Sequence, residues 1–365
     1  QVVGRDEEIQ ELLSKFVAVR VVQANAMDLK LFQFDYDMSF AVTFLRADRT
    51  VYGRFGTRDG NEEAADDEIS MQGLAAAMRG ALELHAGYPG SKQSLVGKQP
   101  VANVTYATPE KIPTMGKYKS VLDYEGKVAG SCIHCHSIRD EQRRIVRNAG
   151  EILGLRELSP WPMPSVLGIQ MDPKQRATVL KIAPGSVAEE SDMKVGDQIL
   201  KANGQPLLST ADLQWTLHAM DDDEDLVLDI LRAGDSVKLS ITPQKGWRES
   251  SDIAWRVSTW DLRRMALGGM RLERISHEAR ATGNLPEAGK MALRALNVGQ
   301  YGEHATAKKA GLEKDDVIIG FNGDDSDLSE SELIKKIASK AKRGERVNVV
   351  YVRGGERMET SFELQ

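Results

Sequence analysis

The 365-residue sequence has little cysteine, few aromatic side chains and no long apolar run. Its two cysteines are too few for the disulfide frameworks that stabilise small secreted domains. No stretch reaches the roughly 18 consecutive apolar residues that a membrane-spanning helix needs, so we expect no such span. A net charge of −6, without basic clusters interleaved with aromatics, predicts no nucleic-acid partner.

Length and composition predict several soluble domains. Hydrophobic residues make up 41% and charged residues 28% of the chain, as in globular proteins. The length exceeds what one ordinary core supports. The sequence begins with Gln1 rather than Met and shows no signal-peptide pattern, from which we expect a piece cut from a longer chain.

An internal repeat is the strongest organisational pattern. The stretch "VGDQILKANGQPL" (195–207) matches "KDDVIIGFNGDDSDL" (314–328) at a constant offset. The matched residues are Asp197 with Asp316, Ile199 with Ile318 and Asn203-Gly204 with Asn322-Gly323, each pair 119 residues apart. Further along the chain, Arg232 matches Arg353. In each copy a short strand runs into Asn-Gly, followed by a polar helix and two alternating strands. We therefore expect two β-rich domains of one fold.

This order of elements resembles the PDZ domain. In the first copy, residues 166–172 resemble the family's carboxylate-binding loop, 177–204 its central body and 209–220 its second helix. In the second copy, residues 267–275 resemble the loop, and an insertion over 276–291 has no counterpart in the first copy.

The PDZ resemblance implies that each copy binds the C-terminus of a protein or an extended peptide as an added strand. Backbone N–H groups of the loop would hold the terminal carboxylate. The residues implied are Leu167, Gly168 and Ile169 in the first copy, and Gly268, Gly269 and Met270 in the second. The alternative is a fold that serves only to pack the domains together.

The N-terminal part has another pattern. Apolar residues Ile9, Leu12, Leu13 and Phe16 predict a helix that leads into a β-branched strand. A hairpin over 38–56 and a helix over 70–89 follow. This order resembles the C-terminal two-thirds of a thioredoxin-like domain. The Cys-x-x-Cys of that family is missing here, so no thiol-disulfide activity is expected of residues 1–90.

Both cysteines lie in "SCIHCHSIRDEQRR" (131–144), a Cys-x-x-Cys-His motif. Spacings of three and four residues place Cys132, Cys135 and His136 on one face of a helical turn, as attachment of a c-type haem needs. The sixth iron ligand would be Met163 or Met115. Zinc bound with the help of His134, thiol redox chemistry and two plain buried thiols are the alternatives.

Other catalytic motifs are missing from the sequence. HtrA-type proteases also carry PDZ domains, but the chain has no Gly-x-Ser-x-Gly. It also has no Walker loop and no Gly-x-Gly-x-x-Gly. We therefore expect an electron carrier or a binding protein rather than a hydrolase or a nucleotide enzyme.

The whole arrangement resembles a bacterial thioredoxin-like/PDZ (seleno)protein family, which implies an exported protein of the periplasm or cell envelope. The expected class is α+β and multidomain. The expected parts are a truncated thioredoxin-like domain (1–90), a connecting Cys-x-x-Cys-His segment (91–160), a first PDZ-like domain (161–246) and a Trp-rich link with a second (247–365). The leading hypothesis is electron transfer through one haem c to a redox partner, docked by the PDZ-like domains. The alternatives are a non-redox interaction scaffold and a thiol oxidoreductase whose active cysteines lie upstream of Gln1.

Overall fold

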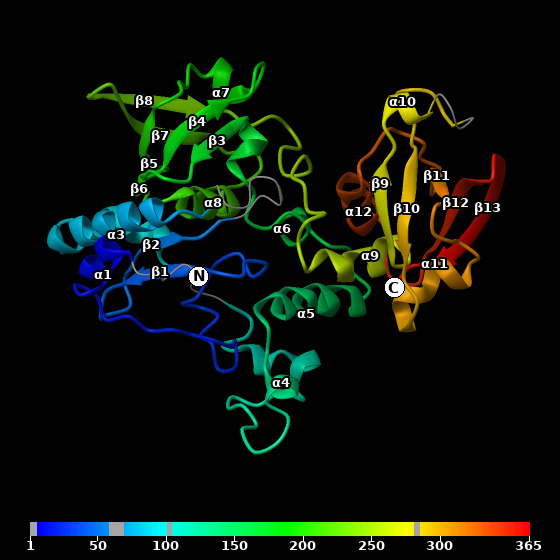
Figure 1. Ribbon diagram of the computed structural model, residues 1–365, viewed down its shortest axis with the longest axis horizontal. Coiled ribbons are helices and arrows are strands. Elements are labelled where there is room, and N and C mark those ends of the chain that lie inside the picture. The colour runs from blue at the N-terminus through cyan, green and yellow to red at the C-terminus, as the bar shows by residue number, and fades with distance from the viewer. Residues whose placement is uncertain (1–5, 58–68, 101–103, 281–284) are drawn as a thin grey trace. The chain divides into compact units, whose positions relative to one another are not determined.

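The chain divides into two compact units (Figure 1). The computed structural model describes residues 6–57, 69–100, 104–280 and 285–365. The first unit comprises Gln1–Ile138 and Pro160–Ser251, and the second comprises Arg139–Ser159 and Asp252–Gln365. The expected α+β, multidomain class is confirmed. The division into four domains stays a prediction.

The N-terminal part of the first unit is a hairpin packed against helices. Its elements are α1 (Glu7–Leu13), β1 (Val42–Leu45), β2 (Val51–Phe55) and α3 (Met71–Ala86). The strands β1 and β2 pair in an antiparallel hairpin. Leu12, Phe44 and Met78 are buried together in one core. The two helices and the hairpin predicted from apolar spacing are confirmed.

The sheet predicted for a thioredoxin-like domain is not found in the described N-terminal residues. Residues 17–22 were expected to form a β-branched strand, but they form neither helix nor strand, and Val17 and Val19 are 93% and 82% exposed. In the described N-terminal residues the sheet has two strands, β1 and β2. β-Branched residues favour a strand only where a partner strand and a buried face exist, and this segment has neither in the structure.

Single helical turns, short helices and one longer helix, α5, connect this part to the two repeats. They are η2 (Lys92–Lys98), η3 (Pro109–Lys111), η4 (Pro113–Met115), α4 (Val128–Ser131), α5 (Cys135–Asn148) and α6 (Leu155–Leu158). The helix predicted after the cysteine motif is confirmed as α5.

The first copy is an antiparallel sheet in the order β3-β4-β5-β7-β8, with β6 paired to β5. Its elements are η5 (Pro164–Leu167), β3 (Ile169–Asp172), β4 (Thr178–Ile182), α7 (Val187–Glu190), β5 (Gln198–Ala202), β6 (Gln205–Pro206), α8 (Thr210–Ala219), β7 (Leu226–Arg232) and β8 (Asp235–Ile241). The core beneath the sheet includes Leu167, Ile199, Leu213 and Leu228. In this order β3 is an edge strand.

The second copy repeats the arrangement in the order β9-β10-β11-β12-β13. Its elements are α9 (Thr259–Leu267), β9 (Met270–Arg274), α10 (His277–Arg280), β10 (Leu293–Val298), η6 (Gly302–Ala305), α11 (Thr306–Lys309), β11 (Val317–Phe321), α12 (Glu330–Ala338), β12 (Arg346–Arg353) and β13 (Glu356–Glu363). Here β9 is the edge strand that corresponds to β3.

Matched ion pairs confirm the internal repeat. The Arg232 guanidinium donates to both carboxylate oxygens of Asp197, each at 2.8 Å. At the matched positions, the Arg353 guanidinium donates to both oxygens of Asp316, each at 2.7 Å. Two parallel charge-assisted hydrogen bonds fix the geometry of each pair. The repeat therefore preserves a specific contact as well as an order of strands.

Within the first unit, the N-terminal part packs on α8, which lies between the sheet of the first copy and the hairpin (Figure 1). The Arg54 backbone N–H donates to Asp212 Oδ1 at 3.0 Å, and Ser209 Oγ donates to the Arg54 carbonyl at 2.6 Å. The Arg54 guanidinium lies 4.0 Å from the ring centroid of Trp215. These contacts are buried, so the hairpin and the first copy form one packed body.

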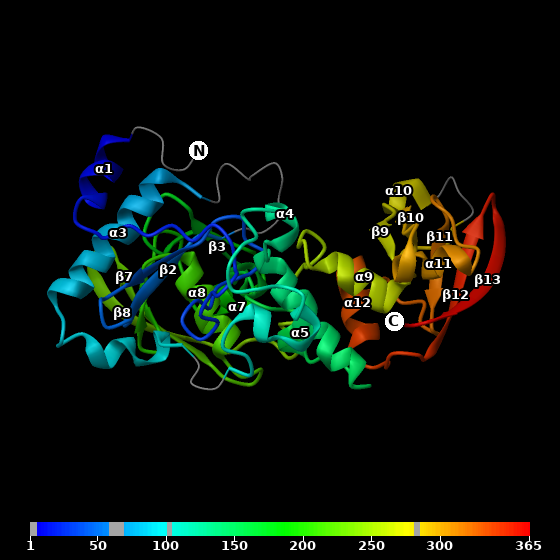
Figure 2. The same ribbon diagram turned by 90° about the horizontal axis from the view of Figure 1, so that it is seen from below.

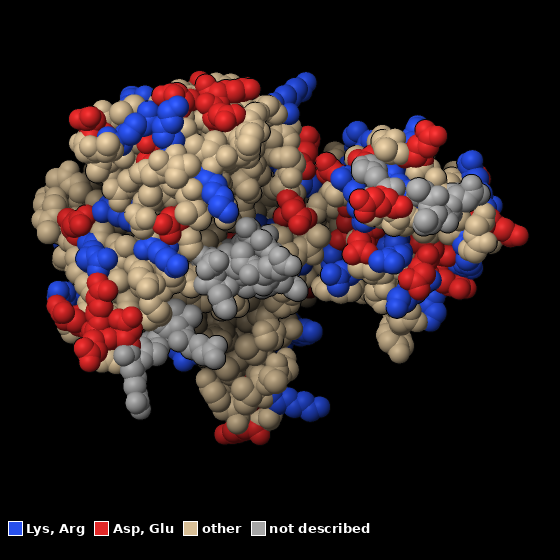
Figure 3. Space-filling view, turned by 45° about the horizontal axis from the view of Figure 1, so that its top comes forward, with Lys and Arg blue, Asp and Glu red and all other residues tan. Residues whose placement is uncertain are grey.

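The surface carries charges of both signs. Figure 3 shows Lys and Arg interspersed with Asp and Glu over the face of each unit, as the small net charge of −6 suggests. Among the described residues, no helix has the length and apolar character needed to cross a bilayer.

Candidate functional site

A tight loop leads into the edge strand of the first copy. The short helix η5 ends at Gly168, whose φ of +84° is left-handed, and β3 begins at the next residue. A Cβ added at Gly168 would lie 2.2 Å from the Cβ of Ser186. Only glycine fits here, because the backbone needs a positive φ and the neighbouring turn needs the space.

The backbone of β3 alternates between its partner strand and the open edge of the sheet. The Ala183 N–H donates to the Gly168 carbonyl at 2.8 Å, so Gly168 faces β4. Since the direction alternates along a strand, Ile169 and Met171 direct their N–H and C=O groups away from β4. Among the described residues, no side chain forms a hydrogen bond with these outward groups. The edge of β3 can therefore accept an added strand.

The helix α8 lies across from β3 in the same domain. Its N-cap is Ser209, and Thr210 is its first residue. Further along, the Gln214 amide donates to the Trp161 carbonyl and to the Met163 sulfur, each at 3.1 Å. Thr57 Oγ1 donates to Gln214 Oε1 at 2.7 Å. These bonds fix the segment that precedes the Gly168 loop against α8.

The loop of the second copy has the same construction. Gly268 and Gly269 both have positive φ, and the Gly299 N–H donates to the Gly269 carbonyl at 3.1 Å. By the same alternation, Met270 and Leu272 direct their N–H and C=O groups away from β10. The Leu272 N–H, however, already donates to Glu330 Oε1 at 2.7 Å. The outward N–H of Leu272 on β9 is therefore bound by a side chain, whereas no side chain of the described residues bonds the outward groups of β3.

The cysteine segment is fixed by its backbone. Ile133, which is buried, donates its N–H to Asn25 Oδ1 at 2.8 Å and accepts from the Ala24 N–H at 3.0 Å. Cys132 precedes α5 in an extended conformation, and Cys135 is the first residue of that helix. The rings of His134 and His136 stack with centroids 5.8 Å apart.

The thiol of Cys135 differs from a reactive redox cysteine. Its place at a helix N-terminus favours the thiolate. Burial nevertheless raises the pKa of Cys135, because the charged form loses its hydration. A raised pKa leaves less thiolate at neutral pH and so makes a poorer nucleophile.

The methionines predicted as a sixth haem ligand serve other contacts. The Met163 sulfur accepts from the Gln214 amide and from Thr57 Oγ1. Met115 is 1% exposed and lies at the end of η4. The described residues contain no group of three or more His, Cys, Asp or Glu side chains arranged to hold a metal ion. In this part of the chain, the donor set therefore does not fit a closed zinc site.

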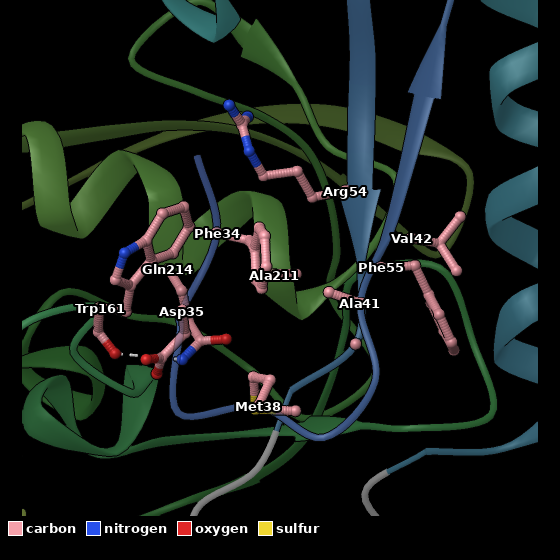
Figure 4. A pocket seen from close by; sticks show the side chains of 11 residues that line it. Phe34, Asp35, Met38, Ala41, Val42, Arg54, Phe55, Trp161, Ala211 and Gln214 are labelled. Atoms are coloured by element: carbon pink, nitrogen blue, oxygen red, sulfur yellow. Dashed lines mark hydrogen bonds between the residues drawn. The ribbon is translucent and has the colours of Figure 1, made fainter. Parts of the chain in front are cut away.

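A small cavity lies between the hairpin and α8. Figure 4 shows Phe34, Met38 and Trp161 among the side chains around it, with Ala211 and Gln214 supplied by α8. Its volume is about 10 Å³. That is the space of about one water molecule, so the cavity is too small to hold an organic ligand.

Reasoning from the sequence missed three residues that bear on the edge strands. Met171 and Leu272 supply outward N–H groups, and only the direction of a neighbouring hydrogen bond shows which residues of a strand face outward. Glu330 follows the N-cap Ser329, a position where an acidic residue already has a local explanation. No sequence pattern predicts its hydrogen bond with Leu272 of β9, because the two residues lie far apart in the chain.

Comparison with known proteins identifies the first copy. Residues 165–242 match the family model described as "PDZ domain". The chain is 29% identical over 170 residues to "Periplasmic pH-dependent serine endoprotease DegQ" of Escherichia coli (strain K12), covering 47% of this chain and 33% of DegQ. It is 25% identical over 198 residues to "Probable periplasmic serine endoprotease DegP-like" of Pseudomonas savastanoi pv. phaseolicola, covering 53% of this chain and 38% of that protein. The chain thus spans between 33% and 38% of the length of these curated relatives.

Solved structures give partial likenesses. One is the HtrA3 PDZ domain bound to a phage-derived ligand (FGRWV), at 27% identity and a TM-score of 0.19, over 21% of this chain and 83% of that domain. Another is the HtrA-type protease AlgW with a decapeptide, at 15% identity and a TM-score of 0.25, over 38% of this chain and 48% of that one.

These relatives correct the interpretation of the cysteine motif. Both are described as serine endoproteases, which cleave peptides with a serine nucleophile and use no haem. The predicted thioredoxin-like/PDZ (seleno)protein family, the electron-transfer function and the haem c on Cys132, Cys135 and His136 are therefore wrong. The redox partner predicted with the haem has no support.

Two other expectations have a different outcome. Both relatives are periplasmic, so the predicted location in the periplasm or cell envelope is confirmed. The multidomain α+β chain contains a PDZ domain, as predicted for the first copy. The peptide-binding roles of Leu167, Gly168 and Ile169, and of Gly268, Gly269 and Met270, stay predictions.

Proposed function

We propose that this chain is a periplasmic peptide-binding protein whose first PDZ domain takes up a C-terminal peptide as a strand added to β3. The observation that carries the proposal is the open edge of β3 directly after the Gly168 loop. A peptide strand paired there would exchange hydrogen bonds with the outward groups of Ile169 and Met171. Its terminal carboxylate would lie at the loop of Leu167, Gly168 and Ile169.

The chemistry of the loop favours a ligand with an apolar last residue. Leu167 and Ile169 are fully buried in the core of the first copy, and Val166 packs against the same core. Val166 is only partly buried, so a peptide side chain placed against it would leave water for apolar surroundings, which is favourable. Peptide recognition then has two parts. The backbone pairing is independent of the peptide sequence, and the apolar contact selects the peptide's last side chain.

Recognition, rather than cleavage, is what the described residues support. Proteolysis is the activity in the names of two relatives, of whose lengths this chain covers 33% and 38%. The matched family model, by contrast, covers residues 165–242, which contain the whole of β3 and α8. The proposal therefore concerns how a peptide is held.

The test measures binding of labelled pentapeptides to the full chain by fluorescence anisotropy. The panel ends in Val, Leu, Ile or Phe, includes FGRWV, and is made with free and with amidated C-termini. We expect at least one free-acid peptide to bind and its amide to bind about tenfold or more weakly, since hydrogen bonds to a charged group are worth about 1.5–3 kcal/mol. Equal affinity for free and amidated peptides would contradict the carboxylate part of the proposal.

A pair of variants tests the strand pairing. Met171→Pro removes the outward N–H, and proline is tolerated on an edge strand whose N–H faces outward. Met171→Leu keeps both the N–H and the packing, so it is the matched control. We expect Met171→Pro to weaken binding about tenfold and Met171→Leu to leave it within about twofold. Strong binding by a folded Met171→Pro chain would refute pairing at β3.

A further inference from the structure

The second copy carries an acidic side chain at the edge where a peptide would pair. In Figures 1 and 2, α12 lies beside β9, at the end of the sheet away from β13. Glu330 is the first residue of α12 and is 5% exposed. Its Oε1 accepts from the Leu272 N–H at 2.7 Å. This N–H points away from the sheet, as that of Met171 does in the first copy.

A second buried charge holds Glu330 in place. Arg263, on α9, is 2% exposed. Its Nε donates to Glu330 Oε1 at 2.9 Å, and a terminal nitrogen donates to Oε2 at 2.5 Å. The same guanidinium also donates to the Ala254 carbonyl at 3.0 Å. A bidentate pair anchored in this way leaves the carboxylate one orientation, toward β9.

We propose that the chain itself closes the outward edge of β9, with the Glu330 carboxylate standing where the backbone carbonyl of an added peptide strand would accept from Leu272. The outward edges of β3 and β9 are called the first and the second groove. The proposal rests on the proposed function only in taking an added strand as the ligand of this fold. A peptide could pair with β9 only by displacing Glu330. Displacement would leave two buried charges without each other, which is costly. The groove is therefore closed at rest.

The first copy lacks this closure. Its helix α8 starts after Ser209 as α12 starts after Ser329, so Thr210 occupies the position of Glu330. The threonine hydroxyl is two carbons closer to the backbone than the glutamate carboxylate, and threonine has no carboxylate to accept from Met171. The two repeats thus share a fold and differ at the one side chain that decides whether the edge is free.

The direct test is amide hydrogen exchange in the full chain. The double variant Arg263→Leu with Glu330→Thr removes both charges together, so that neither is left buried alone. Arg263→Leu with Glu330→Gln is the matched control, because it also removes both charges while the glutamine side-chain carbonyl can still accept from Leu272. The amide of Ile318, buried in the central strand β11, reports any global loss of stability.

We expect the Leu272 amide to exchange at least tenfold faster in the double variant than in the wild type, with Ile318 unchanged. In the matched control, Arg263→Leu with Glu330→Gln, we expect Leu272 exchange close to that of the wild type. Equal Leu272 exchange in the wild type and the double variant would overturn the closure. This readout needs no peptide, so it stands apart from the outcome of the peptide titrations.

A second readout uses the peptide that binds best to the first copy. In a Met171→Pro background, where the first groove is blocked, we expect no binding, and we expect binding to appear when the double variant is added. Binding in the Met171→Pro chain that is lost on adding Leu272→Pro would show an open second groove and overturn the proposal.

Discussion

The most consequential single residues are charges buried without water. Lys98 and Asp212 are both fully buried, with Lys98 Nζ 2.8 Å from Asp212 Oδ2. Burial lowers the pKa of Lys98 to about 8, even though Asp212 acts in the opposite direction. Arg54 is in the same cluster, and burial lowers its pKa to about 10. The packing of the hairpin on α8 therefore includes ionisable groups that strongly prefer to be paired.

The pKa of Lys98 predicts how stability depends on pH. An unfolded lysine has a pKa of about 10.4, so between pH 8 and about 10.4 the unfolded chain binds a proton that the folded chain has released. The free energy of unfolding therefore rises with pH across that window. Lys98→Met should lose this rise and should be about 3 kcal/mol less stable at pH 7, since Asp212 loses its partner. Urea unfolding from pH 7 to 10 measures both effects, and parallel profiles for the two proteins would contradict the assignment.

At the scale of elements, α3 is positioned by one glycine. A Cβ added at Gly73 would lie 2.1 Å from the carbonyl oxygen of Pro173, just after β3. Ser70, the N-cap of α3, donates to the same carbonyl at 2.7 Å. The start of α3 therefore lies directly on the turn that ends β3.

This contact predicts a destabilised Gly73→Ala variant. Alanine normally stabilises a helix relative to glycine by about 1 kcal/mol. Here the added methyl must push backbone aside, and such overpacking costs about 1–3 kcal/mol. Gly87→Ala is the matched control, because the nearest atom to its Cβ would be 3.6 Å away. Thermal unfolding should show a clear loss for Gly73→Ala alone, and equal behaviour of the two variants would contradict the close contact.

Local elements could be predicted from the sequence because their causes are local. The spacing of Ile9 and Leu12 and the capped start of α3 predict helices that the structure contains. The matched Asp197 and Asp316, followed in each copy by Arg232 and Arg353, indicate the repeat, since the same residues recur in the same order in both copies.

The rest depends on contacts between distant residues. The packing of Arg54 on Trp215 joins segments far apart in the chain, and no pattern around either residue predicts it. The valines of residues 17–22 favour a strand, yet the part of the chain that the structure describes places no partner strand beside them. The Cys-x-x-Cys-His spacing predicts a haem from a single turn of helix, but spacing alone does not show what surrounds Met163 or His136.

At the scale of the whole molecule, the two repeats differ at their edge strands. Among the described residues, no side chain bonds the outward groups of Ile169 and Met171 on β3, whereas the edge strand β9 of the second repeat is occupied by a side chain of the chain itself. The edge of β3 lies in the segment that matches the PDZ family model, residues 165–242. The occupied edge belongs to the second repeat, with Glu330 on the Leu272 N–H. Duplication of a fold thus gives two copies that we expect to differ in function.

The central claim is that a peptide adds to β3 as a strand. Residue-resolved amide exchange of the full chain, with and without a saturating C-terminal peptide, tests it most directly. We predict that the peptide slows exchange at Ile169 and Met171 and leaves the Leu272 amide unchanged. Peptide binding that protects other amides and leaves Ile169 and Met171 as exposed as before would contradict the account.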